Sequence, residues 1–112
     1  MSKFGLYSDK PAIPFESHLE GLDEEGKTLL LHLRNFVKNL GNNVIEEIRP
    51  HRITYSKWLT FRTFVDIQPR KDSLAISLKK STSEPIISHM VKNLEDIENV
   101  KPKIAEAYEK IK

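Results

Sequence analysis

Two consecutive runs between residues 61 and 78 alternate between apolar and polar side chains. The positions that share one side are Phe61, Thr63, Val65 and Ile67 in the first run and Leu74, Ile76 and Leu78 in the second. A period of two is typical of a β-strand with one buried face. The intervening residues 68–73, QPRKDS, favour a turn, because Pro, Asp and Ser suit turn geometry. The two runs therefore predict an antiparallel hairpin with one apolar face.

Shorter segments extend this sheet in both directions. Residues 44–48 and 52–56 predict two strands that are separated by a tight break at Pro50 and His51. Residues 86–91 predict an edge strand, with a helix as the alternative. We expect a sheet of four or five antiparallel strands.

A helix is predicted on each side of these strands. The apolar positions of the first are Leu29, Leu30, Leu33, Phe36, Val37 and Leu40, which fall on one face of a helix over residues 24–40. We expect Asp23 to cap its start and Gly41 to end it in a left-handed conformation. A closing helix begins after Asn93, and we expect Pro102 to kink or restart it.

These elements predict an α+β fold: a two-layer sandwich with the N-terminal and C-terminal helices on one face of the sheet. At 112 residues the chain has the size of a single domain, 1–112. We expect residues 1–22 to form an extended N-terminal arm and residues 23–112 to form the core. Tyr55 and Tyr108 are assigned to that core.

Composition narrows the class of protein. The sequence has no cysteine, which excludes disulfides and thiolate chemistry. It has no apolar run long enough for a signal peptide or a membrane span, so we expect a cytoplasmic protein without membrane contact.

Motifs of catalysis are missing. The four histidines are isolated from one another, and no ligand spacing for a metal is present. The four glycines never form a phosphate-binding loop. The strand that follows Asp66 has no acidic residue before its lysines, as a metal-dependent nuclease would need. We therefore expect no enzyme activity, no cofactor and no metal.

Positive charge is concentrated in the predicted sheet. Residues 49–80 hold eight Lys or Arg and two Asp, while the whole chain has a net charge of only +2. The face turned away from the helices is expected to carry Arg52, Thr54, Ser56, Arg62, Phe64, Asp66, Gln68, Ala75, Ser77 and Lys79. Such a face suits sequence-nonspecific binding of DNA or RNA. The residues expected to contact phosphates are Arg52, Lys57, Arg62, Arg70, Lys71, Lys79 and Lys80, and those expected to stack on bases are Trp58 and Phe64.

Other interpretations stay open. The domain could instead mediate protein–protein contact or homodimerisation through the edge strand near Ile86 or the arm near Phe4 and Leu6. A basic strand face can also be merely solvated. For Trp58, packing back over the core is favoured over an exposed ring. The oligomeric state is not determined by the sequence.

Four segments resemble a known family: LRNFVKNLG, ITY, FVDIQPRKDSLAISL and LEDIENVKPKIAEAYEKI. The chain is similar, from about residue 23 to 111, to an uncharacterised domain described as a predicted transport protein, which is found appended to restriction-nuclease-like proteins. More distantly, the closing helix resembles that of MmcQ/YjbR-like domains, which have a CyaY-like fold; the matching residues are Asp96, Ile97, Val100, Ile104, Ala107, Tyr108 and Glu109. Pro102 and a short segment between Lys80 and Val91 depart from the pattern. The resemblance implies this fold, DNA binding and a nuclease-like protein partner, with no catalytic residues.

Overall fold

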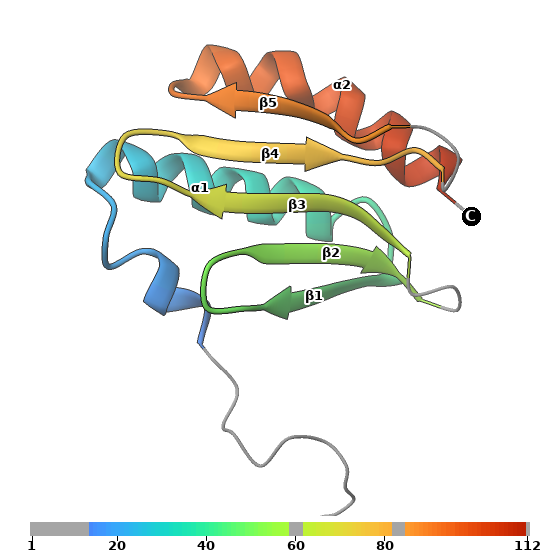
Figure 1. Ribbon diagram of the computed structural model, residues 1–112, viewed down its shortest axis with the longest axis horizontal. Helices are drawn as coiled ribbons and strands as arrows, with labels where there is room; N and C mark the ends of the chain where they lie inside the picture. Colours follow the sequence, from blue (N-terminus) through green and yellow to red (C-terminus); the bar gives the residue numbers. More distant parts are fainter. Residues whose placement is uncertain (1–13, 59–61, 82–84, 112) are drawn as a thin grey trace, which may run out of the picture.

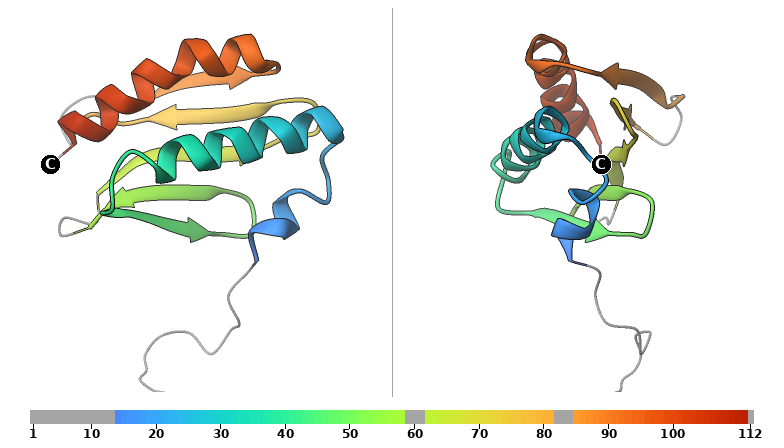
Figure 2. Two further views of the ribbon diagram at one scale, coloured as in Figure 1. Left: turned by 180° about the vertical axis from the view of Figure 1, so that it is seen from behind. Right: turned by 90° about the vertical axis from the view of Figure 1, so that its left-hand side faces the viewer.

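The computed structural model describes residues 14–58, 62–81 and 85–111. Five antiparallel strands form one sheet in the order β1-β2-β3-β4-β5, and the two helices α1 and α2 lie side by side on one of its faces (Figures 1 and 2). This confirms the predicted α+β two-layer sandwich. The strands are β1 (Val44–Ile48), β2 (Ile53–Lys57), β3 (Thr63–Pro69), β4 (Leu74–Leu78) and β5 (Ile87–Val91), and the helices are α1 (Glu24–Lys38) and α2 (Leu94–Lys110). Phe61 lies outside the described residues.

The strand register aligns apolar residues across the sheet. Ile67 of β3 pairs with Ile53 of β2 and with Ile76 of β4, and all three side chains are fully buried. Because side chains alternate along a strand, this row places one whole face of the sheet against the helices. The predicted hairpin is present, and its turn is closed by the backbone N–H of Arg70, which donates to the Ser73 carbonyl at 2.8 Å.

A β-bulge changes the side on which Phe64 lies. Tyr55 pairs with Val65, but its neighbour Ser56 pairs with Thr63, so Phe64 has no partner in the β2–β3 ladder. The extra residue of a bulge disturbs the alternation of side chains. The Phe64 ring turns toward the helices, is fully buried, and meets the ring of Tyr108 edge-on at 5.3 Å between centroids. The expectation that Phe64 lies on the face away from the helices is wrong.

The helices complete the core with the predicted apolar positions. Leu30, Leu33 and Val37 of α1 and Ile97 and Ile104 of α2 are fully buried. Leu31, on the opposite side of α1, is 40% exposed. Tyr55 is buried as expected, whereas Tyr108 is only partly buried and packs at the margin of the core.

The beginning of α1 is as predicted, and its end is not. The Asp23 side chain accepts a hydrogen bond from the Gly26 backbone N–H at 2.8 Å, as expected of an N-cap. The helix ends at Lys38, and Gly41 is not left-handed. Gly41 instead lies so close to the Tyr108 hydroxyl that a β-carbon at this position would clash with it.

Pro102 neither breaks nor restarts the closing helix. α2 runs without interruption from Leu94 to Lys110 with Pro102 inside it, and Asn93 caps its start. Proline leaves the carbonyl of the residue four positions earlier, Glu98, without its helical N–H. Glu98 and Pro102 are both exposed, so water can solvate that carbonyl. The expected restart of the helix at Pro102 is therefore wrong.

The described part of the N-terminal segment is not an extended arm. Residues Phe15–His18 form a 3₁₀ helix, and Phe15 and Leu22 are buried in the core. The His18 ring forms a hydrogen bond with the Arg49 carbonyl at 2.7 Å, which ties this segment to the end of β1. The expectation of an extended arm over residues 1–22 is therefore wrong from Phe15 onward, and residues 1–13, with Phe4 and Leu6, lie outside the described residues.

One ion pair is largely enclosed between α1 and the sheet. The Arg34 guanidinium donates from Nε and Nη2 to the two carboxylate oxygens of Glu46 at 2.9 and 3.0 Å. The Tyr55 hydroxyl donates to the same carboxylate at 2.8 Å, and the guanidinium lies 4.0 Å from the centre of the Phe15 ring. The Glu46 side chain is only 12% exposed. This cluster joins the N-terminal segment, α1, β1 and β2.

Candidate binding surface on the open sheet face

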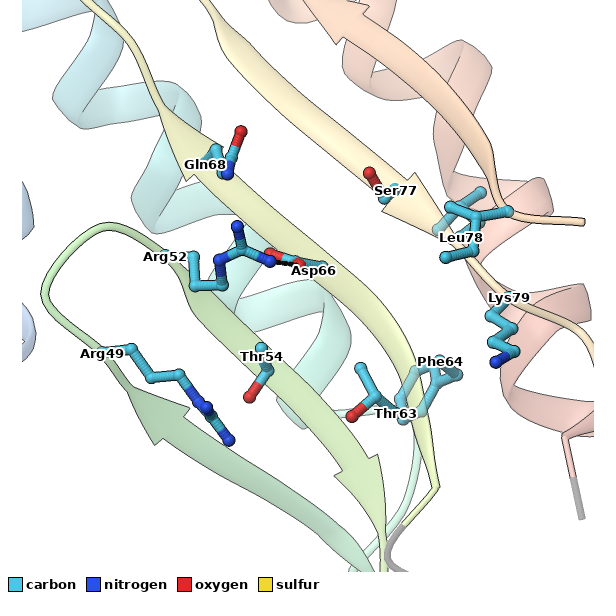
Figure 3. Close-up of a pocket in the computed structure, with 11 residues that line it drawn as sticks. Arg49, Arg52, Thr54, Thr63, Phe64, Asp66, Gln68, Ser77, Leu78 and Lys79 are labelled. Atoms are coloured by element: carbon cyan, nitrogen blue, oxygen red, sulfur yellow. Dashed lines mark hydrogen bonds and ion pairs between the residues drawn. The ribbon is translucent and has the colours of Figure 1, made fainter. Parts of the chain in front are cut away.

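The sheet face opposite the helices, here called the open face, holds a broad cavity. Its volume is about 500 Å³ (Figure 3). It is lined by Arg49, Arg52, Thr54, Thr63, Phe64, Asp66, Gln68, Ser77, Leu78, Lys79 and Ile86. These residues come from all five strands or their ends, and most of them are polar. The cavity is therefore a broad surface across the sheet, where polar side chains are mixed with the apolar Phe64, Leu78 and Ile86.

Cations and carboxylates share this surface. Arg52 donates from Nη1 to Asp66 Oδ2 at 2.8 Å, and Arg49 donates from Nη2 to Glu47 Oε1 at 3.2 Å. Both guanidinium groups remain about half exposed, which leaves N–H donors directed at solvent. Lys79 lies at the opposite side of the cavity (Figure 3). Exposed guanidinium and ammonium groups bind anionic oxygens such as those of phosphate.

Hydroxyl groups follow one another across the same face. Ser56 and Thr63 hydrogen-bond to each other at 3.2 Å, and Ser77 and Ser88 do so at the same distance. Asp66 supplies the only acidic side chain of the cavity lining. Its Oδ1 atom is buried and has no hydrogen-bond partner among the described residues, while its Oδ2 atom accepts from Arg52. The surface can bind an anionic, hydrogen-bonding ligand.

Three of the nine predicted binding residues lie on or beside the open face. Arg52 and Lys79 line the cavity; Arg62 is exposed immediately before β3 but does not line it. Arg49 was not predicted, although it also lines the cavity. The tight break between β1 and β2 was the feature of the sequence that could have indicated Arg49. This break brings Arg49 next to Arg52, with 2.8 Å between the Arg49 backbone nitrogen and the Arg52 carbonyl oxygen.

Three other predicted residues turn toward the helices. Lys57 donates from Nζ to the carbonyl of Ile111 at 3.1 Å, at the end of α2, and Lys80 pairs with Glu106 of α2 at 3.0 Å. Phe64 is in the core, as described above. Side chains two positions apart along a strand point to the same face, so Lys57 points the same way as the buried Tyr55 and Lys80 the same way as the buried Leu78. Their long side chains reach over the margin of the core to the helix. Both side chains therefore lie on the helical side of the sheet and not on the open face.

The remaining three lie at the ends of the sheet. Arg70 and Lys71 are exposed in the β3–β4 turn, away from the cavity. Trp58 follows β2, and its backbone N–H donates to the Asn43 carbonyl at 2.7 Å. Its side chain is 54% exposed, so the favoured expectation that it packs over the core is wrong.

The edge formed by β5 is the second notable surface. The exposed large apolar residues here are Ile86, Ile87, Met90 and Leu94, at 60, 47, 50 and 50%. Residues 85–91 contain no Lys, Arg, Asp or Glu. Edge strands in natural proteins are commonly protected by charge, and an exposed apolar patch marks an interaction site.

The described residues offer neither a metal-binding cluster nor a membrane-spanning helix. No group of His, Cys, Asp or Glu side chains there could hold a metal ion. Neither described helix has the length and apolar character needed to cross a membrane.

Comparison with known proteins provides no family for the chain. No family model, no curated protein and no solved structure matches it.

Proposed function

We propose that the domain binds nucleic acid without catalysis and without sequence preference. In this proposal the open face of the sheet contacts the phosphate backbone of the nucleic acid. The observation that carries this proposal is the wide cavity on the uncovered side of the sheet, with Arg49, Arg52 and Lys79 around it. Phosphate contacts of this kind supply affinity but little sequence information. The position of Arg62, exposed beside β3, supports the same assignment.

The structure restricts the proposed contact to fewer residues than the charge of the sequence suggested. Lys57 and Lys80 are not part of it, because both contact the helical layer. Phe64 borders the cavity, but it is fully buried and its ring packs against Tyr108. With Phe64 buried, the middle of the open face has no exposed ring, and Trp58 at the end of β2 is left as the aromatic side chain for base stacking. Partial neutralisation of Arg49 and Arg52 by Glu47 and Asp66 implies modest affinity.

Fluorescence anisotropy with labelled single- and double-stranded oligonucleotides tests the proposal. If about three phosphates are neutralised, the logarithm of the binding constant should fall with the logarithm of salt concentration at a slope of about −2 to −3. We expect Arg52→Gln and Lys79→Glu each to weaken binding several-fold and to make this slope shallower.

Lys27→Glu is the matched control for Lys79→Glu. It changes the net charge by the same amount, but Lys27 lies in the first turns of α1, on the helical layer, and its exposed ion pair with Glu24 at 3.5 Å contributes little to stability. Binding should survive in this variant. Equal losses of affinity in Lys27→Glu and Lys79→Glu would show that binding depends on net charge and not on the open face. Undetectable binding at low salt would refute the proposal.

A further inference from the structure

The outer side of β5 has no strand paired with it in the part of the chain that the structure describes. β5 ends the sheet and pairs only with β4 on its inner side (Figure 1). Its outer backbone N–H and C=O groups are thus available for one more strand. The opposite edge of the sheet, β1, carries Glu46 and Glu47 instead. The two edges therefore differ, and only β5 combines an uncharged strand with exposed apolar side chains.

A groove runs between this edge and α2. Its volume is about 160 Å³, and it is lined by His89, Met90, Val91, Asp96, Asn99, Val100 and Lys103. Asp96 and Lys103 lie two helical turns apart on α2 and carry opposite charges. Met90, Asn99 and Val100 lie between these two charged residues along the groove. An acid at one end, a base at the other and an uncharged centre form a self-complementary pattern.

We propose that β5 pairs antiparallel with β5 of a second copy of this chain, about a two-fold axis that passes beside Met90. A two-fold interface brings the same patch of both copies together, so a residue at one end meets the residue at the other end. The axis brings the two Met90 side chains together and turns the Asp96 end of each groove toward the Lys103 end of the other. Since residues 85–91 carry no charge, the strands meet without like-charge repulsion.

The dimer would have a continuous sheet of ten strands. An axis perpendicular to the sheet keeps both helical layers on one side and both open faces on the other. Pairing therefore leaves the proposed nucleic-acid surface uncovered, and dimerisation and nucleic-acid binding can fail independently of each other.

Sedimentation of the full chain measures the association. The monomer has a mass of 13.0 kDa, and we expect a species of twice this mass to increase across about 5 to 500 μM, the range in which a small interface is populated. Met90→Lys should shift the equilibrium to monomer, because it places two ammonium groups face to face on the axis. Leu31→Lys is the control: Leu31 is also an exposed apolar residue, 40% accessible, but it lies on α1.

Single cysteines report the register, because the chain has none of its own. Only a residue on the axis meets its own copy, so oxidised Met90→Cys should form a disulfide-linked dimer, while Ser88→Cys, which faces residue 92 of the other copy, and Leu31→Cys should not. The Cβ atoms of directly opposed residues, about 4.5–5.5 Å apart, are close enough for this bond after a small adjustment. A monomer at every concentration, or cross-linking of Ser88→Cys or Leu31→Cys as efficient as that of Met90→Cys, would overturn the proposal, whatever the outcome of the oligonucleotide experiments.

Discussion

The hydroxyl of Tyr108 lies directly over Gly41, with no space between them for a β-carbon. The same hydroxyl donates a hydrogen bond to the Asn43 side chain, which is 65 positions earlier in the sequence. The Tyr108 ring contacts Phe64 edge-on, and the Lys57 ammonium lies 4.4 Å from its centre. Tyr108 therefore joins the last helix to the loop after α1 and to two strands.

Gly41→Ala should destabilise the protein by about 1–3 kcal/mol, because the added methyl group forces the Tyr108 hydroxyl to move and weakens its hydrogen bond. Urea unfolding measures the loss. Gly21→Ala is the control, since a β-carbon there meets nothing within 4 Å. In a Tyr108→Phe background the cost of Gly41→Ala should shrink. An unchanged cost would locate the clash elsewhere.

Removal of the cation from the enclosed cluster should cost more than removal of an exposed cation from the same carboxylate. Arg34→Met leaves Glu46, 12% exposed, without its paired charge, and we expect a loss of roughly 2–4 kcal/mol in the free energy of unfolding. Lys38→Met is the matched comparison. Its ammonium lies 3.9 Å from Glu46 and is 48% exposed, so the loss should stay below about 1 kcal/mol. Similar losses in the two variants would show that the enclosure of the Arg34–Glu46 pair is unimportant.

The same cluster predicts a pH dependence of stability. Burial alone would raise the pKa of Glu46, but hydrogen bonds from Arg34 and Tyr55 and the charge of Arg34 outweigh it, so that the pKa is lowered from its ordinary value of 4.5. The unfolded chain therefore binds this proton more readily than the folded protein does. The stabilisation is complete above about pH 4.5 and is lost as the pH falls through the lower pKa of the folded state.

The comparison of wild type with Glu46→Gln isolates this titration from that of the other carboxylates. The free energy of unfolding, measured by urea between pH 7 and pH 3, should fall more steeply with decreasing pH in the wild type than in the variant. Tyr55 should not contribute, since burial and the hydrogen bond to Glu46 raise the pKa of its phenol and keep it neutral over this range. Parallel curves for the two proteins would contradict the assigned direction of the Glu46 pKa.

Periodicity was sufficient to predict the layers of this fold. The alternation along β4 and along β3 from Val65 onward and the helical spacing of Leu29, Leu33 and Val37 depend on local geometry alone, and each indicated the correct element and its buried side. The capping residues Asp23 and Asn93 were predicted for the same reason. Such features are encoded within a few neighbouring positions.

The binding surface was only partly predictable, because it depends on contacts between distant residues. The bulge opposite Tyr55 and Ser56 turned Phe64 inward, and strict alternation cannot anticipate an inserted residue. Lys57 and Lys80 illustrate a second limit. Their positive charge was counted with the sheet, but their partners, the Ile111 carbonyl and Glu106, belong to a helix more than 20 residues away. Net charge in a segment therefore does not show which face carries it.

Pro102→Ala should stabilise the protein, since α2 tolerates the proline rather than needing it. The substitution supplies the N–H that the Glu98 carbonyl lacks and removes the crowding of the ring against the preceding turn. Proline also restricts the unfolded chain, which offsets part of this gain, so we expect a net increase of about 1–2 kcal/mol in the free energy of unfolding. Glu109→Ala, an exposed α2 substitution that restores no hydrogen bond, should change stability by less than about 0.5 kcal/mol. A loss of stability in Pro102→Ala, measured by thermal unfolding beside this control, would show that the proline sets the shape of α2 against the sheet.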